Sequence, residues 1–237
     1  MLMSLFNLLK EERMKLAKLA VFSLLSMSAL TASASIHSLS FVGGHDLSST
    51  NWNDVFSLQR FDANLGTLTG VNVDLYGTVK GSAKYESLDA SASNVQIDLG
   101  AIIKLATVSG KNLLTINPLV SNAYSASAYD GITDFGGTSG KTLTGLSANA
   151  ADSEVLNSAS WLSLFTGPGM INLKLAAQAA SSASGPGNLT TQFATNAAAN
   201  YKITYTYAVT PVPEPETYAL MGLGMLALLV HRRKQVK

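Results

Sequence analysis

YKITYTYAV, residues 201–209, is the segment of this chain that decides its fold class. Apolar or aromatic side chains occupy every second position and polar or small ones lie between them; the alternating set is Tyr201, Ile203, Tyr205, Tyr207 and Val209. Successive side chains of a strand point to opposite faces of a sheet. The segment therefore predicts a β-strand with one face in a hydrophobic core.

Three shorter segments show the same alternation, at residues 71–76, 95–99 and 171–175. No long segment of the core has helical periodicity. Such short strands predict an all-β fold, an antiparallel, jelly-roll-like β-sandwich that forms one domain over residues 35–210. Glycine and proline mark turns between the strands, at Gly43-Gly44, Gly66, Gly70, Gly136-Gly137, Gly167-Pro168-Gly169 and Gly185-Pro186-Gly187.

Two stretches of the core are less regular. Residues 176–184 are rich in alanine and serine, so propensity alone allows a helix. Their serines and the Gly-Pro-Gly that follows favour a continued strand or a loop instead. Residues 130–154 show no pattern that assigns them to an element.

The N-terminus has the three parts of a secretory signal peptide. Small residues at Ala32 and Ala34 follow an apolar run over residues 19–30, so we expect signal peptidase to remove residues 1–34. An uncleaved anchor is disfavoured because the run has only twelve residues. Two glutamates are unusual in the basic region, which makes Met14 an alternative start of translation. That basic region consists of Arg13, Lys15 and Lys18.

The C-terminus combines a rigid motif, an apolar run and a basic cluster. Val212-Pro213-Glu214-Pro215 contains two prolines, which favour extended backbone. Thirteen uncharged residues, 218–230, follow, and Arg232-Arg233-Lys234 comes next. A helix of that length spans about 20 Å, less than the roughly 30 Å of a hydrocarbon core, yet the run lacks the polar face of a core helix. We expect a single short transmembrane helix, with Arg232, Arg233 and Lys234 as a cytoplasmic membrane stop.

These three parts, in this order at residues 211–237, resemble the PEP-CTERM sorting signal. The resemblance implies that Val212, Pro213, Glu214 and Pro215 are recognised by an exosortase, a membrane cysteine transpeptidase thought to cleave near the motif. It also implies a Gram-negative bacterium, often one that makes exopolysaccharide and biofilm matrix. The protein would be held transiently in the inner membrane and then sorted to the cell envelope, the surface or the extracellular matrix.

Three segments of the core carry a second resemblance. They are Phe61-Asp62-Ala63-Asn64-Leu65-Gly66-Thr67-Leu68, Phe165-Thr166-Gly167-Pro168-Gly169 and the closing Tyr205-Thr206-Tyr207. Over residues 50–210 the chain resembles the choice-of-anchor domains, the E type in particular. Those domains carry interchangeable C-terminal anchors and have no assigned activity. The resemblance therefore implies a fold and no chemistry.

The composition excludes several kinds of site. The chain has no cysteine, which excludes thiol nucleophiles, thiolate metal sites and iron–sulfur clusters. Outside the two targeting ends, eight Lys or Arg face eleven Asp or Glu, a net charge of −3. A weakly acidic surface gives no electrostatic footprint for nucleic acid. We expect no cofactor.

Two motifs imitate nucleotide sites. Gly136-Gly137-Thr138-Ser139-Gly140-Lys141-Thr142 is close to a P-loop, but Phe135 stands where the first glycine is needed. Exported compartments also lack ATP, so we expect a polar hairpin loop. Gly222-Leu223-Gly224 follows no strand and lies inside the apolar run, so it predicts no dinucleotide site.

Histidines and acids offer weaker candidates. His37 and His45 have no evident third metal ligand, and the chain has no Gly-x-Ser-x-Gly elbow for a serine nucleophile, so we expect surface histidines. Asp130 and Asp134 flank Gly131 in a loop that could bind calcium. They lack EF-hand spacing, so we expect solvated turn acids and no metal site.

Two functions fit these patterns. The favoured one is a non-enzymatic, exported surface or extracellular-matrix protein that is associated with exopolysaccharide or biofilm and sorted by an exosortase. The alternative is an exported polysaccharide-active hydrolase that uses paired carboxylates as acid and base, whose partners would meet only in the fold.

Overall fold

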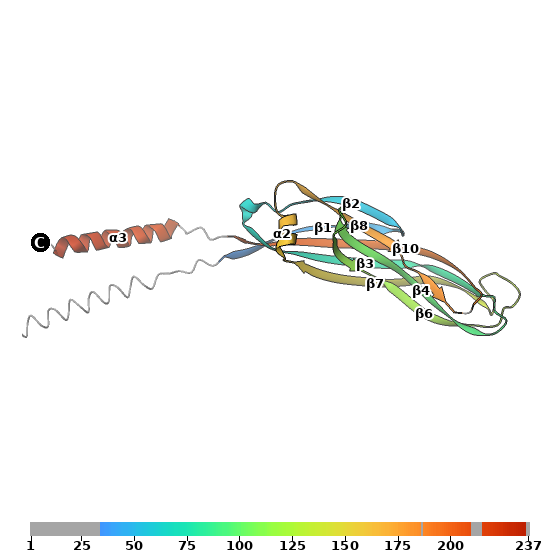
Figure 1. Cartoon of the computed structure of the whole chain (residues 1–237). Helices are drawn as coiled ribbons and strands as arrows, with labels where there is room; N and C mark the ends of the chain where they lie inside the picture. Colours follow the sequence, from blue (N-terminus) through green and yellow to red (C-terminus); the bar gives the residue numbers. More distant parts are fainter. Residues whose placement is uncertain (1–33, 186, 210–214, 236–237) are drawn as a thin grey trace, which may run out of the picture. The chain divides into compact units, whose positions relative to one another are not determined.

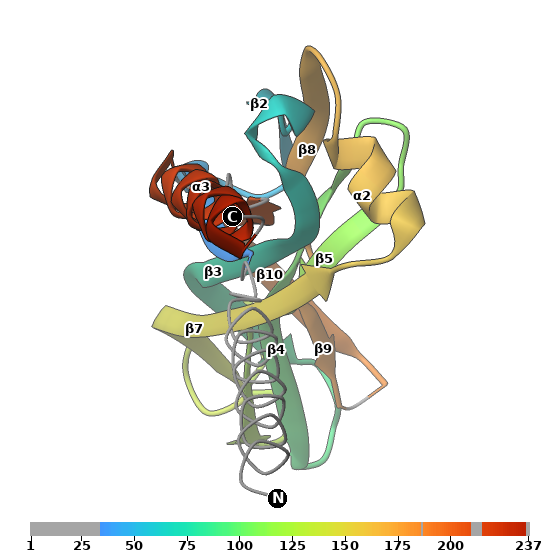
Figure 2. The same cartoon turned by 90° about the vertical axis from the view of Figure 1, so that its left-hand side faces the viewer.

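The computed structural model describes residues 34–185, 187–209 and 215–235. Residues 36–209 form one compact unit, called the β-domain below, and the two chain ends form another. In the second unit the structure describes the helix α3 (Pro215–Gln235). Figure 1 and Figure 2 label most of the elements. Those of the β-domain are β1 (Ser35–Ser49), β2 (Trp52–Gln59), η1 (Ala63–Leu65), β3 (Thr67–Ser87), β4 (Ser93–Thr107), β5 (Asn112–Ile116), β6 (Leu119–Ala126), β7 (Gly140–Leu156), α2 (Ala159–Phe165), β8 (Met170–Ala179), β9 (Ser182–Ser184) and β10 (Leu189–Val209).

The β-domain is a sandwich of two antiparallel sheets, as the sequence predicts. One sheet has the order β1-β10-β3-β7, and the other has the order β2-β8-β4-β5 with β6 and β9 also paired to β4. Figure 2, turned by 90°, shows β3, β7 and β10 apart from β8 and β5. β10 and β3 pair along almost their whole length, from Leu189 opposite Ser87 to Ala208 opposite Thr67. The deciding segment, residues 201–209, is the second half of this long inner strand.

The alternating residues face the core, where they were expected. Val71, Val73 and Leu75 of β3 and Ile203 and Tyr205 of β10 have no exposed surface. They pack with the inner faces of β4 and β8 in one large cluster. Burying a large apolar side chain contributes about 1.5–3 kcal/mol, so this cluster is the main source of stability. A smaller cluster at β3, β4, β6 and β7 consists of Ala83, Tyr85, Val95, Ile97, Ala126 and Leu143.

The strand β4 changes its partners at Gly100. Before it, β4 pairs with β6 and β9; after it, β4 pairs with β5 and β8. The Pro118 carbonyl accepts from the Ala101 N–H at 3.1 Å, and the Ser181 hydroxyl accepts from the Gly100 N–H at 3.2 Å. Both neighbouring strands are thus interrupted beside one residue. β4 therefore pairs with two strands along each of its edges, β6 and β5 along one and β9 and β8 along the other.

Some sequence expectations were wrong in detail. Gly43, Gly44 and Gly70 lie inside strands rather than in turns. A Cβ at Gly43 would collide with the Tyr201 ring of β10, so this glycine permits close packing. Residues 140–156, in the stretch that the pattern left unassigned, form the edge strand β7. The short helix α2 was not predicted. The Ala/Ser-rich stretch 176–184 continues as strand, in β8 and β9, as favoured.

Candidate functional site

Three of the four residues of the predicted recognition segment, Val212, Pro213 and Glu214, lie outside the described residues, as does Ala32. The same holds for the signal peptide up to residue 33. Ala34 is exposed and directly precedes β1. The roles assigned to these residues therefore stay predictions.

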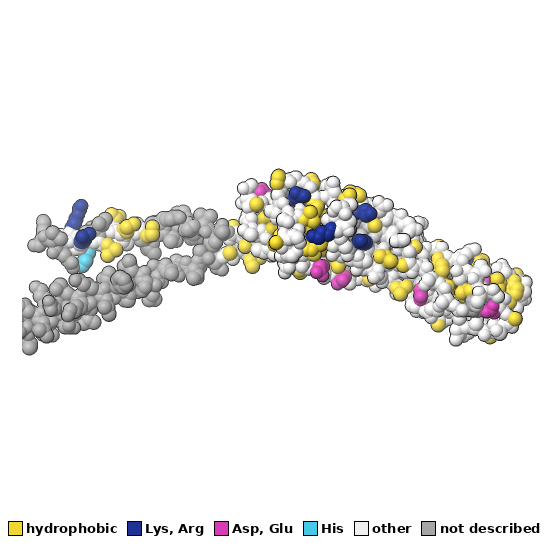
Figure 3. All heavy atoms as spheres, viewed as in Figure 1, with side chains coloured by type: hydrophobic (Ala, Val, Ile, Leu, Met, Phe, Trp, Pro, Cys, Tyr) yellow, Lys and Arg dark blue, Asp and Glu magenta, His cyan; other side chains and the backbone are white. Residues whose placement is uncertain are grey.

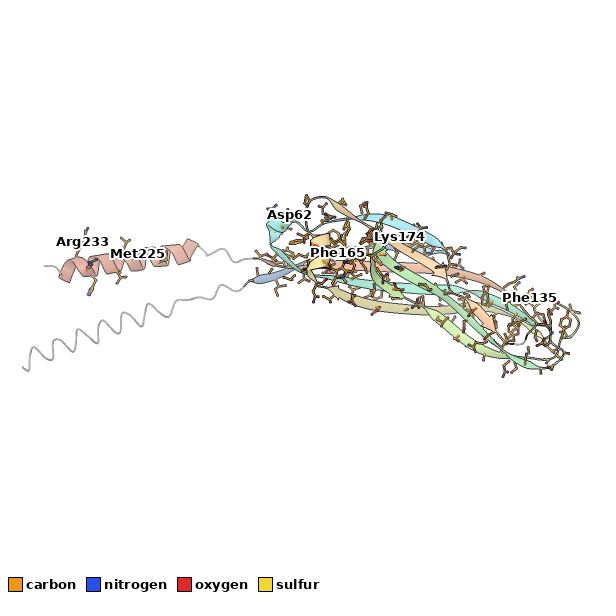
Figure 4. The ribbon with its side chains drawn as sticks, viewed as in Figure 1. Asp62, Phe135, Phe165, Lys174, Met225 and Arg233 are labelled. Carbon is orange, nitrogen blue, oxygen red and sulfur yellow. The ribbon has the colours of Figure 1, made fainter. Side chains whose placement is uncertain are left out.

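The C-terminal segment is helical from Pro215 to Gln235, which includes Arg232, Arg233 and Lys234. Arg232 and Arg233 are exposed, and Figure 4 labels Arg233 and Met225 on this helix. In the described part of the chain no helix is both long enough and apolar enough to cross a membrane. The expected transmembrane helix over 218–230 is thus not found there. Its apolar run has thirteen residues, and the helix continues into charged ones. Among the helix side chains that the structure describes, the exposed large apolar ones are Met221, Leu223, Met225, Leu226 and Leu228.

The P-loop-like segment and the residue before it form hydrogen bonds with a carboxyl group of the protein itself. Glu86, at the end of β3, is fully buried. Its Oε1 accepts from the Ser139 hydroxyl at 2.6 Å, and its Oε2 accepts from the Phe135 N–H at 2.8 Å. A Cβ at Gly140 would collide with this carboxyl group, so glycine leaves room for it there. The loop is a turn that binds the Glu86 carboxyl group.

The acidic loop uses its carboxylates in the same way. Asp130 Oδ1 accepts from the Ile132 N–H at 3.1 Å, and Asp134 Oδ1 accepts from the Gly136 N–H at 2.8 Å. The Ile132 N–H bond is the main cause that lowers the pKa of Asp130. Among the residues that the structure describes, no three His, Asp or Glu side chains come together as a metal site would need. Figure 4 shows that Phe135, in this loop, lies at the opposite end of the β-domain from Asp62 and Phe165.

His45 has a more organised setting than a surface histidine. Its Nδ1 lies 2.6 Å from Asp54 Oδ2, and its Nε2 lies 2.7 Å from Ser48 Oγ. The imidazole stacks on Trp52, with ring centroids 3.9 Å apart and planes inclined by 15°. The side chains of His45 and Asp54 are 22% and 48% exposed. These contacts have the same order of groups as a Ser-His-Asp triad.

The position of this chain of hydrogen bonds indicates a structural role. Ser48 and His45 belong to β1 of one sheet, whereas Asp54 belongs to β2 of the other. The contacts therefore join the two sheets along the side where both edge strands lie. Neither of the two grooves described below is lined by Ser48 or His45. Sequence reasoning missed the arrangement because no serine elbow marks it; the only signal is the clustering of all four polar and aromatic partners within residues 45–54.

The larger groove, called the lysine groove below, lies on the outer face of the second sheet. It has a volume of about 500 Å³ and runs across β8 and β4 to the β4–β5 turn. Figure 3 shows dark-blue basic side chains gathered over this part of the β-domain, with no magenta acidic side chain between them. Figure 4 labels Lys174 on β8. The polar residues that line the groove are Asn51, Asn53, Lys104, Thr107, Lys174 and Gln178.

A second groove, of about 440 Å³, lies on the outer face of the other sheet. Tyr76 stands in it with 54% of its surface exposed. Beside it, the Thr78 hydroxyl donates to Asn149 Oδ1 at 2.7 Å. Small side chains of β7 and β10 form the floor. Neither groove is lined by an Asp or Glu, so neither offers the paired carboxylates of a glycoside hydrolase.

Comparison with known families identifies the C-terminal segment. Residues 211–234 match the PEP-CTERM protein-sorting motif. The motif implies processing by an exosortase, and PEP-CTERM proteins are exported and sorted to the cell surface. The match does not extend into the β-domain, so the resemblance to the choice-of-anchor E domain stays a prediction. No curated protein matches the chain.

Solved structures show only weak likeness. The crystal structure of dimeric latent PorU from Porphyromonas gingivalis is 14% identical with a TM-score of 0.28, over 76% of this chain and 14% of that one. The structure of infectious bursal disease virus, Gx strain, is 11% identical with a TM-score of 0.21, over 80% of this chain and 47% of that one. The chain thus spans less than half of either protein. At these scores the likenesses carry no argument about fold or function.

Proposed function

We propose that this chain is a surface or extracellular-matrix protein of a Gram-negative bacterium, exported by its signal peptide, processed by an exosortase and associated with exopolysaccharide or biofilm. The β-domain, of the choice-of-anchor E type, acts by binding and not by catalysis. The observation that carries this proposal is the sorting motif at residues 211–234. In it Val212, Pro213, Glu214 and Pro215 form the recognised segment. Arg232, Arg233 and Lys234 hold the precursor at the membrane until it is processed.

The helix after the motif supports this order of events. Its described side chains between 221 and 228 are mostly exposed and apolar, and exposed Arg232 and Arg233 follow them. An apolar segment favours a lipid environment, and cations beyond it favour the cytoplasmic side. The helix therefore suits brief contact with the inner membrane, and removal by the exosortase would release the β-domain.

Binding is favoured over hydrolysis for the β-domain. A carboxylate-based glycosidase needs two carboxyl groups about 5–10 Å apart in one cleft. The lysine groove and the second groove, in which Tyr76 stands, are lined by amides, hydroxyls, lysines and one exposed tyrosine. Neither is lined by an acidic side chain. These groups can contact sugar hydroxyls and carboxylates without acid–base chemistry.

The sorting role is tested in the native host by replacing Pro213, Glu214 and Pro215 with alanine together. Export should continue, because the signal peptide and the β-domain are unchanged. The precursor should keep its C-terminal segment and accumulate in the inner-membrane fraction, as intact mass and cell fractionation would show. Thr210→Ala, directly before the motif at residues 211–234, is the matched control and should be processed normally. If the triple variant is processed and sorted like the parent, the motif is not a recognition element and the proposal fails.

A further inference from the structure

We propose that the lysine groove binds an acidic polysaccharide, one whose sugar units carry carboxylates. The inference rests on the proposed function, because that function places the β-domain outside the cell among secreted polymers. It adds a ligand class and a site to it.

The two lysines are placed together by the strand register. Lys174 of β8 lies opposite Ala106 of β4, and Lys104 of β4 lies opposite Ala176 of β8. The lysines are therefore diagonal neighbours on one face, with backbones roughly 7–8 Å apart. Each faces an alanine across the strand pair, so small residues form the floor between two long cationic side chains. Both side chains are exposed.

No acidic side chain offsets these charges. Within residues 34–185 and 187–209, neither ammonium group has a carboxylate within ion-pair distance, the described ion pair being His45 with Asp54. Neighbouring like charges repel each other, and a bound carboxylate would relieve this repulsion. The β-domain as a whole has three more acidic than basic residues. The groove thus contains two lysines and no acidic residue in a domain whose net charge is negative. This local positive charge favours an anionic ligand.

The other groups around the groove suit a sugar. The amides of Asn53 and Gln178 form no hydrogen bond with other described residues, so they can donate to and accept from hydroxyls. Ile102 and Val108 line the groove with 42% and 55% of their surfaces exposed. Such apolar surfaces can pack on the C–H face of a sugar ring.

The number of charges favours a polysaccharide over nucleic acid. Duplex DNA carries a charge for about every 1.7 Å of its axis, and its binding proteins neutralise several phosphates. Two lysines on a net acidic domain cannot supply this. A chain with one carboxylate per sugar unit, or fewer, matches the sparse charge of the groove.

Binding is tested with the processed protein purified from its host and polygalacturonate as the acidic probe. Calorimetry or affinity electrophoresis at low salt should detect binding, which should weaken as salt is raised. The double variant Lys104→Gln/Lys174→Gln should bind roughly 2–25-fold more weakly, since each exposed ion pair is worth roughly 1.4–5-fold. Lys80→Gln, on the outer face of the other sheet, is the matched control and should bind like the parent. Unchanged melting temperatures would show that all variants fold.

Three results would overturn the inference. They are equal binding by the double variant and the parent, equal binding of neutral dextran and polygalacturonate, and binding of phosphatidylglycerol vesicles in place of polygalacturonate. The last would assign the groove to a lipid headgroup. Because these measurements use purified protein and the sorting test uses cells, failure of the groove leaves the sorting proposal standing, and the reverse also holds.

Discussion

Replacing Ser139 with alanine should destabilise the β-domain through a single buried hydrogen bond. Ser139 and Glu86 are both fully buried, and the hydroxyl donates to the carboxylate at 2.6 Å. A hydrogen bond to a charged group contributes about 1.5–3 kcal/mol, and its loss leaves a buried carboxylate oxygen without this donor. In a domain of this size 1 kcal/mol corresponds to about 2–4 °C. The melting temperature should therefore fall by roughly 3–12 °C in a calorimetric scan.

The matched control for this change is Ser125→Ala. Ser125 donates to Asn94 Oδ1 at 3.3 Å in an exposed pair on β6 and β4, so its loss should change the free energy of unfolding by less than about 0.5 kcal/mol. Glu86→Gln should also lower the melting temperature. Its amide replaces one accepting oxygen with an N–H donor, which would face the Phe135 N–H or the Ser139 hydroxyl. If Ser139→Ala unfolds like the parent in both heat and urea, Glu86 does not hold the 127–139 loop, and the reasoning about its buried carboxylate is wrong.

Three further changes probe other contacts. Hydrogen bonds from Ser121, Gln96 and Ser182 lower the pKa of Asp98, so the stability that the ionised Asp98 contributes should be lost as the pH falls below about 4. In Asp98→Asn the urea midpoint of unfolding should therefore depend less on pH in this acid range. An unchanged dependence would contradict this. Burial raises the pKa of Tyr205, so the free energy of unfolding should fall as the pH rises above about 10. Tyr205→Phe should move the midpoint of alkaline unfolding, followed by circular dichroism, to a higher pH. His45→Ala should cost about 1–2 kcal/mol by loss of the Asp54 and Ser48 bonds. If the parent hydrolyses p-nitrophenyl acetate and Ser48→Ala does not, Ser48, His45 and Asp54 are instead catalytic.

The sequence was a good guide to the fold wherever burial on one face produced a period of two. Residues 71–76, 95–99, 171–175 and 201–209 all lie in strands, since one face of each packs in the core. β1 and β7 are among the strands that were not predicted. They are edge strands with mostly exposed side chains, so little burial selects an alternating pattern in them. The glycines of β1 led to the wrong prediction of a turn. Gly43 is needed there because the Tyr201 ring packs closely against it.

The candidate sites were less predictable because they depend on register. Lys104 and Lys174 are seventy residues apart in the sequence, and only the pairing of β4 with β8 makes them neighbours. Glu86 likewise meets Ser139 through the return of the chain into β7. The sorting motif could be recognised from sequence alone, since its three parts are contiguous and in a fixed order.

The placement of β10 has a mechanical consequence. This strand lies between β1 and β3 and ends two residues before the sorting motif. A pull on the chain beyond Val209 would act along the strand axis, and the hydrogen bonds to its neighbours lie perpendicular to that axis. The bonds on both sides would therefore be loaded together in shear, whereas an edge strand would share the load on one side only. Force applied at this end of the β-domain would therefore be resisted by the pairing of β10 with two strands, β1 and β3.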